Sequence, residues 1–212
     1  MNRRLAAFAL LGIAAYVVVD VVLVFLRPHF SVLHNAESDY GSRGPYAWVM
    51  DANFLLRCAF SLAVVALLPA RLRVSRALLA VWAVGSGLLA FFPDDPPGTT
   101  LTGHGKVHAA LAVVVFVAVT LGTRLASRRL GDRLLIVLSW AAVVPLLLLG
   151  RAHIRVHSLG GLYEKVFLGI EIAWLAIVAA RVAGWKVSAL RPTGSRPTVS
   201  SSAVTSPPTQ SG

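Results

Sequence analysis

Two pairs of histidines in this chain are spaced four residues apart: His104 with His108, and His153 with His157. Residues four apart share one face of a helix, so two imidazoles at this spacing can bind a single metal ion. One hypothesis is therefore a zinc site, with candidate ligands Asp95, His104, His108, His34 and His157. The alternative is that these are solvated histidines, the first pair lying beside a helix start capped by Thr102 or Gly103.

A serine in an earlier polar stretch, residues 27–46, could add a nucleophile. Ser38 lies four residues after His34, and a helical turn there would let the imidazole activate the hydroxyl. We consider Ser38 and Asp95 as candidate catalytic residues, with a bound zinc ion activating water for hydrolysis. Without a metal, protonated histidines could still recognise a phosphate or another anionic head group. The simpler alternative is a polar loop with ordinary turn hydrogen bonds.

The elements that position these residues are apolar. The chain is 57% hydrophobic and 14% charged, with a mean hydropathy of +0.73. Ordinary soluble domains carry about 25% charged residues, and a membrane span needs roughly 20 apolar ones. We predict an all-α, polytopic membrane bundle of six transmembrane helices within residues 1–186. The predicted spans are 5–26, 47–68, 74–92, 107–125, 134–149 and 162–182.

The charges are sorted by the connection in which they lie. Thirteen Lys and Arg residues fall at one side of the predicted bundle and six at the other, the side that also holds all six histidines. Because cytoplasmic segments carry the basic excess, both termini are predicted to be cytoplasmic, in a plasma membrane. The net charge of +11 then indicates contact with anionic membrane lipids and no nucleic-acid partner. Residues 187–212, rich in Ser, Thr and Pro, are predicted to form a disordered cytoplasmic tail.

Polar residues also occur inside the predicted spans, where they are costly. Arg57 and Glu171 fall at the same depth near the middle of the membrane, and we predict that they form a pair. Asn53 lies one turn from Arg57, while Asp20 and Asp51 lie nearer the outer ends of their spans. These residues predict a polar cavity that opens outward. The alternative is a buried ion pair that only fixes the order of the helices.

Several short segments resemble a known family. They are the segments 31–34 and 38–41, Trp48 with Asn53 and Phe54, Phe92 and Pro93 with Asp95, His104 with His108, and 161–165 followed by Trp174. Together they resemble the uncharacterised bacterial membrane family catalogued as domain of unknown function 998, over nearly the whole chain except the tail. The family more often has Arg at the position of Lys165. It implies a membrane fold but no activity.

A weaker likeness connects Ser38, Asp95, His104 and His108 with membrane zinc hydrolases of the alkaline ceramidase type. Those proteins typically have seven spans, and six are predicted here. Three functions therefore remain open: a protein that binds a lipid or a partner at an outward-facing Ser/Asp/His site, a metal-dependent hydrolase of a lipid ester or amide, and a proton-coupled transporter. The transporter ranks last because the sequence has no internal repeat.

Overall fold

The computed structural model describes residues 2–96, 98–152 and 159–184. The predicted disordered tail, residues 187–212, lies outside these residues. The described chain is helical throughout its regular elements: α1 (Asn2–Leu26), the 3-10 helix η1 (Ser38–Gly41), α2 (Ala47–Leu67), α3 (Arg73–Leu89), α4 (Gly103–Leu130), α5 (Arg133–Ala141), α6 (Val143–Ala152) and α7 (Gly160–Ala183).

The helices are long and apolar enough for a membrane protein. Within the described residues, five segments could cross a bilayer by length and composition: α1, α2, α4, α7, and α5 with α6 taken together as Arg133–Ala152. The remaining helix, α3, has 17 residues and is about 25 Å long, a little short of the ~30 Å hydrocarbon core. The prediction of an all-α membrane bundle is therefore confirmed, with α3 as a short sixth rod.

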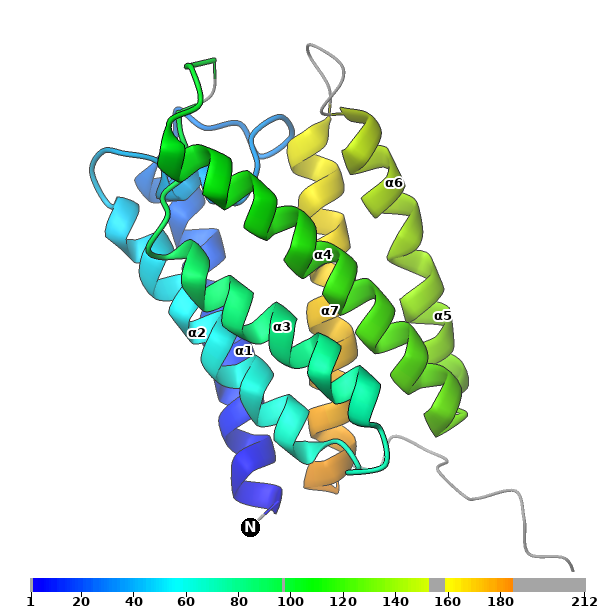
Figure 1. The fold of residues 1–212 in the computed structure, drawn as a ribbon. Helices are drawn as coiled ribbons and strands as arrows, with labels where there is room; N and C mark the ends of the chain where they lie inside the picture. The colour runs from blue at the N-terminus through cyan, green and yellow to red at the C-terminus, as the bar shows by residue number, and fades with distance from the viewer. Residues whose placement is uncertain (1, 97, 153–158, 185–212) are drawn as a thin grey trace, which may run out of the picture.

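One predicted span is divided in two. α5 ends at Ala141 and α6 begins at Val143, with a turn at Ala142. Pro145 follows three residues later, and it has no backbone N–H to give to the carbonyl of Ala141, four residues before it. The two segments still run in the same direction, so together they fill the place of a single rod (Figure 1).

The connection between α4 and α5 is short because both helix ends are capped locally. Gly131 ends α4 in the left-handed conformation, with φ of +69°. The next residue, Asp132, caps α5 by accepting a hydrogen bond from Leu135 N at 3.2 Å. The two helices therefore turn back on each other and pack as neighbours.

The rods form a closed ring. α1 packs against α2, α2 against α3, α3 against α4, and α4 against α5; α7 then joins α6 to α1 and also contacts α2 and α4 (Figure 1). Two tryptophans fill the centre, and each uses its indole N–H. Trp82 donates to Ser61 Oγ at 3.0 Å, and Trp174 donates to Ser127 Oγ at 2.8 Å.

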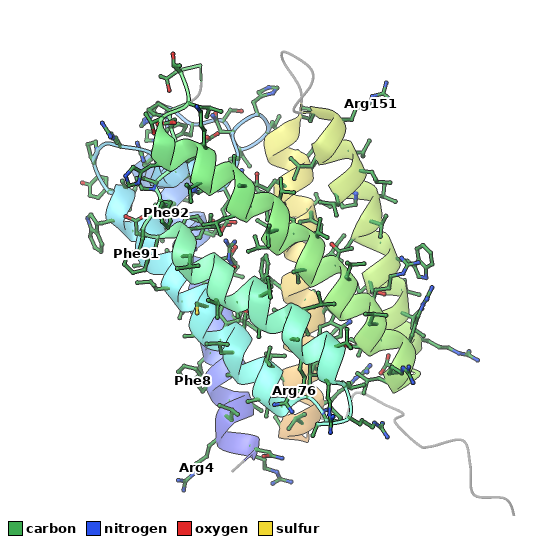
Figure 2. All side chains as sticks on the ribbon, viewed as in Figure 1. Arg4, Phe8, Arg76, Phe91, Phe92 and Arg151 are labelled. Atoms are coloured by element: carbon green, nitrogen blue, oxygen red, sulfur yellow. The ribbon has the colours of Figure 1, made fainter. Side chains whose placement is uncertain are left out.

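The two ends of the bundle differ in side-chain character. Arg4 and Arg76 lie at the end that holds the N-terminus, whereas Phe91, Phe92 and Arg151 lie toward the opposite end (Figure 2). The described connections that carry Ser38, Asp95 and His34 are at this second end, which we call the loop end. It is formed by residues 27–46, the α3–α4 connection and the start of α7.

Candidate functional site

The first connection, residues 27–46, folds over the loop end as an ordered cover. Arg27 is buried, and its guanidinium donates hydrogen bonds to the backbone of this connection. Its Nη1 donates to the carbonyls of Tyr40 and Ser42, each at 2.7 Å, and its Nη2 donates to Arg43 O at 3.3 Å. Because these carbonyls are satisfied by one side chain, the stretch can be buried without a regular ladder of hydrogen bonds.

The same connection is tied to the start of α7. Leu162 N donates to Leu33 O at 2.9 Å, and Lys165 Nζ donates to Asn35 O at 2.7 Å. Gly161 lies directly against the backbone of Asn35, where a Cβ atom would meet Asn35 O at 2.1 Å. Glycine is therefore required for this close approach.

The cover places one acidic side chain inside the bundle. Glu37, from the cover, accepts a hydrogen bond from Tyr16 of α1 at 2.5 Å and one from Arg57 of α2 at 2.9 Å. All three residues are buried. The guanidinium of Arg57 also lies over the rings of Phe54 and Trp82, at 4.9 and 5.0 Å from their centroids. The charge is thus both paired and packed against aromatic faces.

Further polar groups complete this cluster, which we call the buried polar centre: Tyr16, Asp20, Glu37, Arg57 and Glu164. Glu164 of α7 is buried and accepts a hydrogen bond from the backbone N–H of Glu37 at 3.2 Å. Asp20 of α1 lies beside Glu37. The centre holds three carboxyl groups and one guanidinium, so its acidic groups outnumber its cation.

The prediction that Arg57 pairs with Glu171 is wrong: the partner of Arg57 is Glu37. Glu37 reaches down from the cover and supplies the carboxylate to Arg57. Glu171 is 1% exposed and forms no ion pair with another described residue; the hydroxyl of Thr123 lies next to its carboxyl group. The matched depth of Arg57 and Glu171 in their spans could not identify the true partner, because that partner lies in a loop and not in a span.

The other predicted intramembrane residues have separate positions. Asn53 is buried and donates from Nδ2 to Tyr16 O at 3.4 Å, one helical turn from Arg57. Asp51, at the outer end of α2, is half-buried beside Gly41 of η1.

A second polar group lies at the edge of the cover, where it meets the α3–α4 connection and α4. Ser38 Oγ donates to Asp94 Oδ2 at 2.8 Å, and His108 Nε2 lies 3.7 Å from the same oxygen. His108 Nδ1 lies 2.7 Å from the carbonyl of Phe92, so this nitrogen carries the hydrogen. We call Ser38, Asp94 and His108 the outer polar site. Ser38 and His108, predicted to share one cluster, are therefore brought together through Asp94.

Asp95 and His104 are directed elsewhere. Asp95 fixes the start of α4: Oδ2 accepts from Thr102 N at 2.6 Å, and Oδ1 accepts from the Thr102 hydroxyl at 3.0 Å. Thr102 in turn caps the helix by accepting from Gly105 N. His104 is exposed, and its ring lies against that of Phe92. The two histidines of this pair thus have different surroundings despite their spacing.

The predicted zinc ligands do not converge within the described residues. No group of three His, Cys, Asp or Glu side chains there could hold a metal ion. His34 is exposed on the cover, and His153 and His157 lie outside the described residues.

Acidic groups gather around the outer polar site. Burial raises the pKa of Asp39 and the nearby Asp94 adds to the rise, although a hydrogen bond from Asn35 opposes it. The carboxylate of Asp39 accepts from Asn35 Nδ2 at 2.9 Å and from Ala36 N at 2.8 Å. The side chain of Asp94 is 21% exposed, so water or a ligand can reach it.

This geometry is suited to binding more than to nucleophilic catalysis. A serine nucleophile needs a base that accepts its proton and is oriented by a third group. Here the Ser38 hydroxyl and the His108 ring both face the carboxylate of Asp94. The carboxylate is the centre of the arrangement: the Ser38 hydroxyl and the backbone N–H of Asp95 orient it by hydrogen bonds, and His108 lies beside it.

Sequence reasoning missed Tyr16 and Glu37 and gave Asp94 less weight than Asp95. Tyr16 lies in an apolar span and Glu37 in a loop, and neither position has a periodic signal. For Glu164 and Lys165 the sequence offers one indication of importance, because both lie in the segment 161–165 that resembles the family.

Residues 10–181 match the model of a family described as a protein of unknown function, DUF998. The match runs from within α1 to near the end of α7, so it includes both polar clusters. A comparison with curated proteins gives no match, and neither does one with solved structures. The family resemblance is confirmed, and nothing supports the likeness to alkaline ceramidases.

Proposed function

This chain belongs to the DUF998 family of multi-pass integral membrane proteins, and on that premise we propose that it binds the head group of a lipid at the outer polar site. The observation that carries the proposal is the partly exposed carboxylate of Asp94, which accepts one hydrogen bond from the Ser38 hydroxyl and one from Asp95 N, with His108 Nε2 3.7 Å away. A partly exposed carboxylate fixed by two hydrogen bonds is preorganised to accept a donor from a ligand.

The charge around the site selects the chemistry of the ligand. Asp39, Asp94 and Asp95 lie at this edge, and within the described residues none of them pairs with Lys or Arg at ion-pair distance. A primary ammonium group, with three N–H donors, complements such a carboxylate. A quaternary ammonium group cannot donate, so an ethanolamine-type head group should bind better than a choline-type one.

Apolar residues at the same end support a lipid as the source of the ammonium group. Phe91, just after α3, is 65% exposed (Figure 2). Leu101 and Val107 are exposed on either side of the start of α4. Tyr46 and Trp48 add exposed aromatic rings, a residue type that favours the membrane interface.

The proposal includes the orientation of the protein. Thirteen Lys and Arg residues on the side of the termini, against six on the loop end, favour cytoplasmic termini in the bacterial plasma membrane. The outer polar site then faces the outer leaflet.

Lipid competition tests the proposal directly. The purified protein is placed in choline-lipid vesicles containing a small fraction of spin-labelled ethanolamine or choline lipid, and the motionally restricted fraction is measured. We expect preference for the ethanolamine lipid and a loss of about tenfold or more with Asp94→Asn, since hydrogen bonds to charged groups contribute about 1.5–3 kcal/mol. Ser31→Ala, on the cover but outside the site, is the matched control. Equal retention of the two lipids would refute the proposal.

A second candidate function is proton-coupled transport, and Glu171 favours it. Glu171 is buried inside a membrane span and has no cationic partner among the described residues; such a carboxyl group is expensive there and often serves proton transfer. Proteoliposomes with an imposed pH gradient and an internal pH dye would show proton flux that Glu171→Gln abolishes. No flux in the wild type, or flux unchanged in the variant, would remove this candidate.

A further inference from the structure

A cavity of about 530 Å³ lies at the end of the bundle opposite the outer polar site. Its walls come from the α2–α3 connection, the first turn of α3 and the last turns of α4. The lower end of α3, where Figure 2 labels Arg76, marks its position. This cavity shares no residue with the outer polar site or the buried polar centre.

The charged residues that line the cavity are all cations: Arg71, Arg73 and Arg129. No acidic side chain lines it, and none of the three arginines forms an ion pair with another described residue. All three are exposed at this end of the molecule. Guanidinium groups donate in a fork that matches the oxygens of a phosphate.

The start of α3 adds backbone donors to the same cavity. Its cap residue, Leu72, makes no side-chain hydrogen bond to the helix, and the first turn contains no acidic residue. The first N–H groups of a helix have no partner within it and carry the positive end of the helix dipole. Because residues 73–75 line the cavity, these donors lie beside the arginines, and the buried Ser75 adds a hydroxyl.

The remaining walls indicate that the anion belongs to a lipid. Val74 of α3 is 64% exposed and Leu125 of α4 is 38% exposed, and both line the cavity. A free phosphate ion would gain nothing from these apolar side chains. A phospholipid would place its phosphate among the arginines and its acyl chain along Val74 and Leu125.

We propose that this cavity is a binding site for an anionic phospholipid of the leaflet at this end of the bundle, with Arg71, Arg73 and Arg129 holding the phosphate. It is independent of the proposed function, because it lies at the other end of the bundle and selects the opposite charge. The shared chemistry is a phosphate group, which could also come from a free ion, and the test distinguishes the two sources.

Two triple variants separate a built site from general attraction of a basic surface. The test variant is Arg71→Gln with Arg73→Gln and Arg129→Gln. The control is Arg76→Gln with Arg128→Gln and Arg133→Gln, which removes three charges from the same end without touching the lining of the cavity. Both are purified in a neutral detergent and titrated with phosphatidylglycerol, phosphatidylcholine and inorganic phosphate, with lipid retention in native mass spectrometry as the readout.

The wild type and the control variant should retain phosphatidylglycerol in preference to phosphatidylcholine, and the test variant should bind it about tenfold or more weakly. Equal losses in the two triple variants would mean a diffuse electrostatic effect and would overturn the proposal. So would equal retention of the two lipids by the wild type. If inorganic phosphate displaces phosphatidylglycerol at similar concentrations, the acyl chain contributes nothing and the site is one for a free anion.

Discussion

Glu37 shows at the residue scale how a loop can neutralise a charge inside a membrane bundle. It brings a carboxylate to Arg57 and accepts the hydroxyl of Tyr16, while its own backbone N–H donates to Glu164. A buried charge without a partner costs several kcal/mol, whereas the paired charge is tolerated. The cover is therefore part of the interior of the bundle.

Removing either member of this pair should be worse than removing both. We expect Glu37→Gln and Arg57→Leu each to destabilise the protein by about 3–5 kcal/mol, and the double variant to cost clearly less than their sum. Unfolding in bicelles followed by tryptophan fluorescence would measure the cycle. As a control, Arg57→Leu with Glu171→Gln should be additive within about 0.5 kcal/mol. Coupling with Glu171 instead of Glu37 would contradict the structure.

Asp39 should make stability depend on pH. Burial and Asp94 raise its pKa, so the folded protein holds its proton more tightly than the unfolded chain does. This contribution is fully present below the unfolded pKa of about 3.9 and is lost as pH rises through the higher folded value. Asp39→Asn should remove that pH-dependent part of the unfolding free energy. An identical pH profile in the variant would show that Asp39 is not responsible.

The residue scale also shows what the sequence could not reveal. Ser38 and His108 were predictable as members of one cluster, because both lie in connections at one end of the bundle. The choice between Asp94 and Asp95 depended on the turn geometry, in which Asp95 is used by Thr102. The partner of Arg57 depended on how the cover folds, for which hydropathy gives no information.

At the scale of elements, the contact between the cover and α7 holds the loop end together. It rests on the hydrogen bond from Leu162 to Leu33, the bond from Lys165 to Asn35, and the close approach at Gly161.

The six apolar rods were predictable from hydropathy, including the short third one. Hydropathy does not show the break between α5 and α6, because both halves are equally apolar; its signal in the sequence is Pro145.

A methyl group at Gly161 should separate these elements. Gly161→Ala places a Cβ atom 2.1 Å from Asn35 O, so the backbone must move, and we expect a loss of about 1–3 kcal/mol in stability. Gly169→Ala is the matched control on the same helix, where a Cβ atom meets nothing within 4 Å. That change should be neutral or stabilising by about 0.5–1 kcal/mol. Equal thermal stabilities of the two variants would contradict the packing described.

At the scale of the whole molecule, the bundle separates two chemistries. The loop end gathers carboxylates and histidines, and the opposite end gathers arginines around an open cavity. Between them, the described interior of the bundle is apolar apart from the buried polar centre, Asn53, Glu171 and several hydroxyl groups. The two ends can therefore be tested independently.

Labelling of single cysteines should reveal the orientation. In a Cys58→Ala background, Thr99→Cys at the loop end should react with a membrane-impermeant maleimide in intact cells, because that end is proposed to face outward. Arg128→Cys, exposed at the opposite end, should react only after the membrane is permeabilised. The reverse pattern would show that the termini are outside.

The pairing of Arg57 with Glu37 has a consequence for biosynthesis. Glu37 precedes Arg57 by only 20 residues, so the ribosome has already delivered the carboxylate when the arginine emerges. α1, the cover and α2 can therefore leave the translocon as one hairpin whose central charge is already neutralised. Glu164, 127 residues after Glu37, is made much later. The cover can close only when α7 arrives, so the last of the described helices to be synthesised completes the loop end.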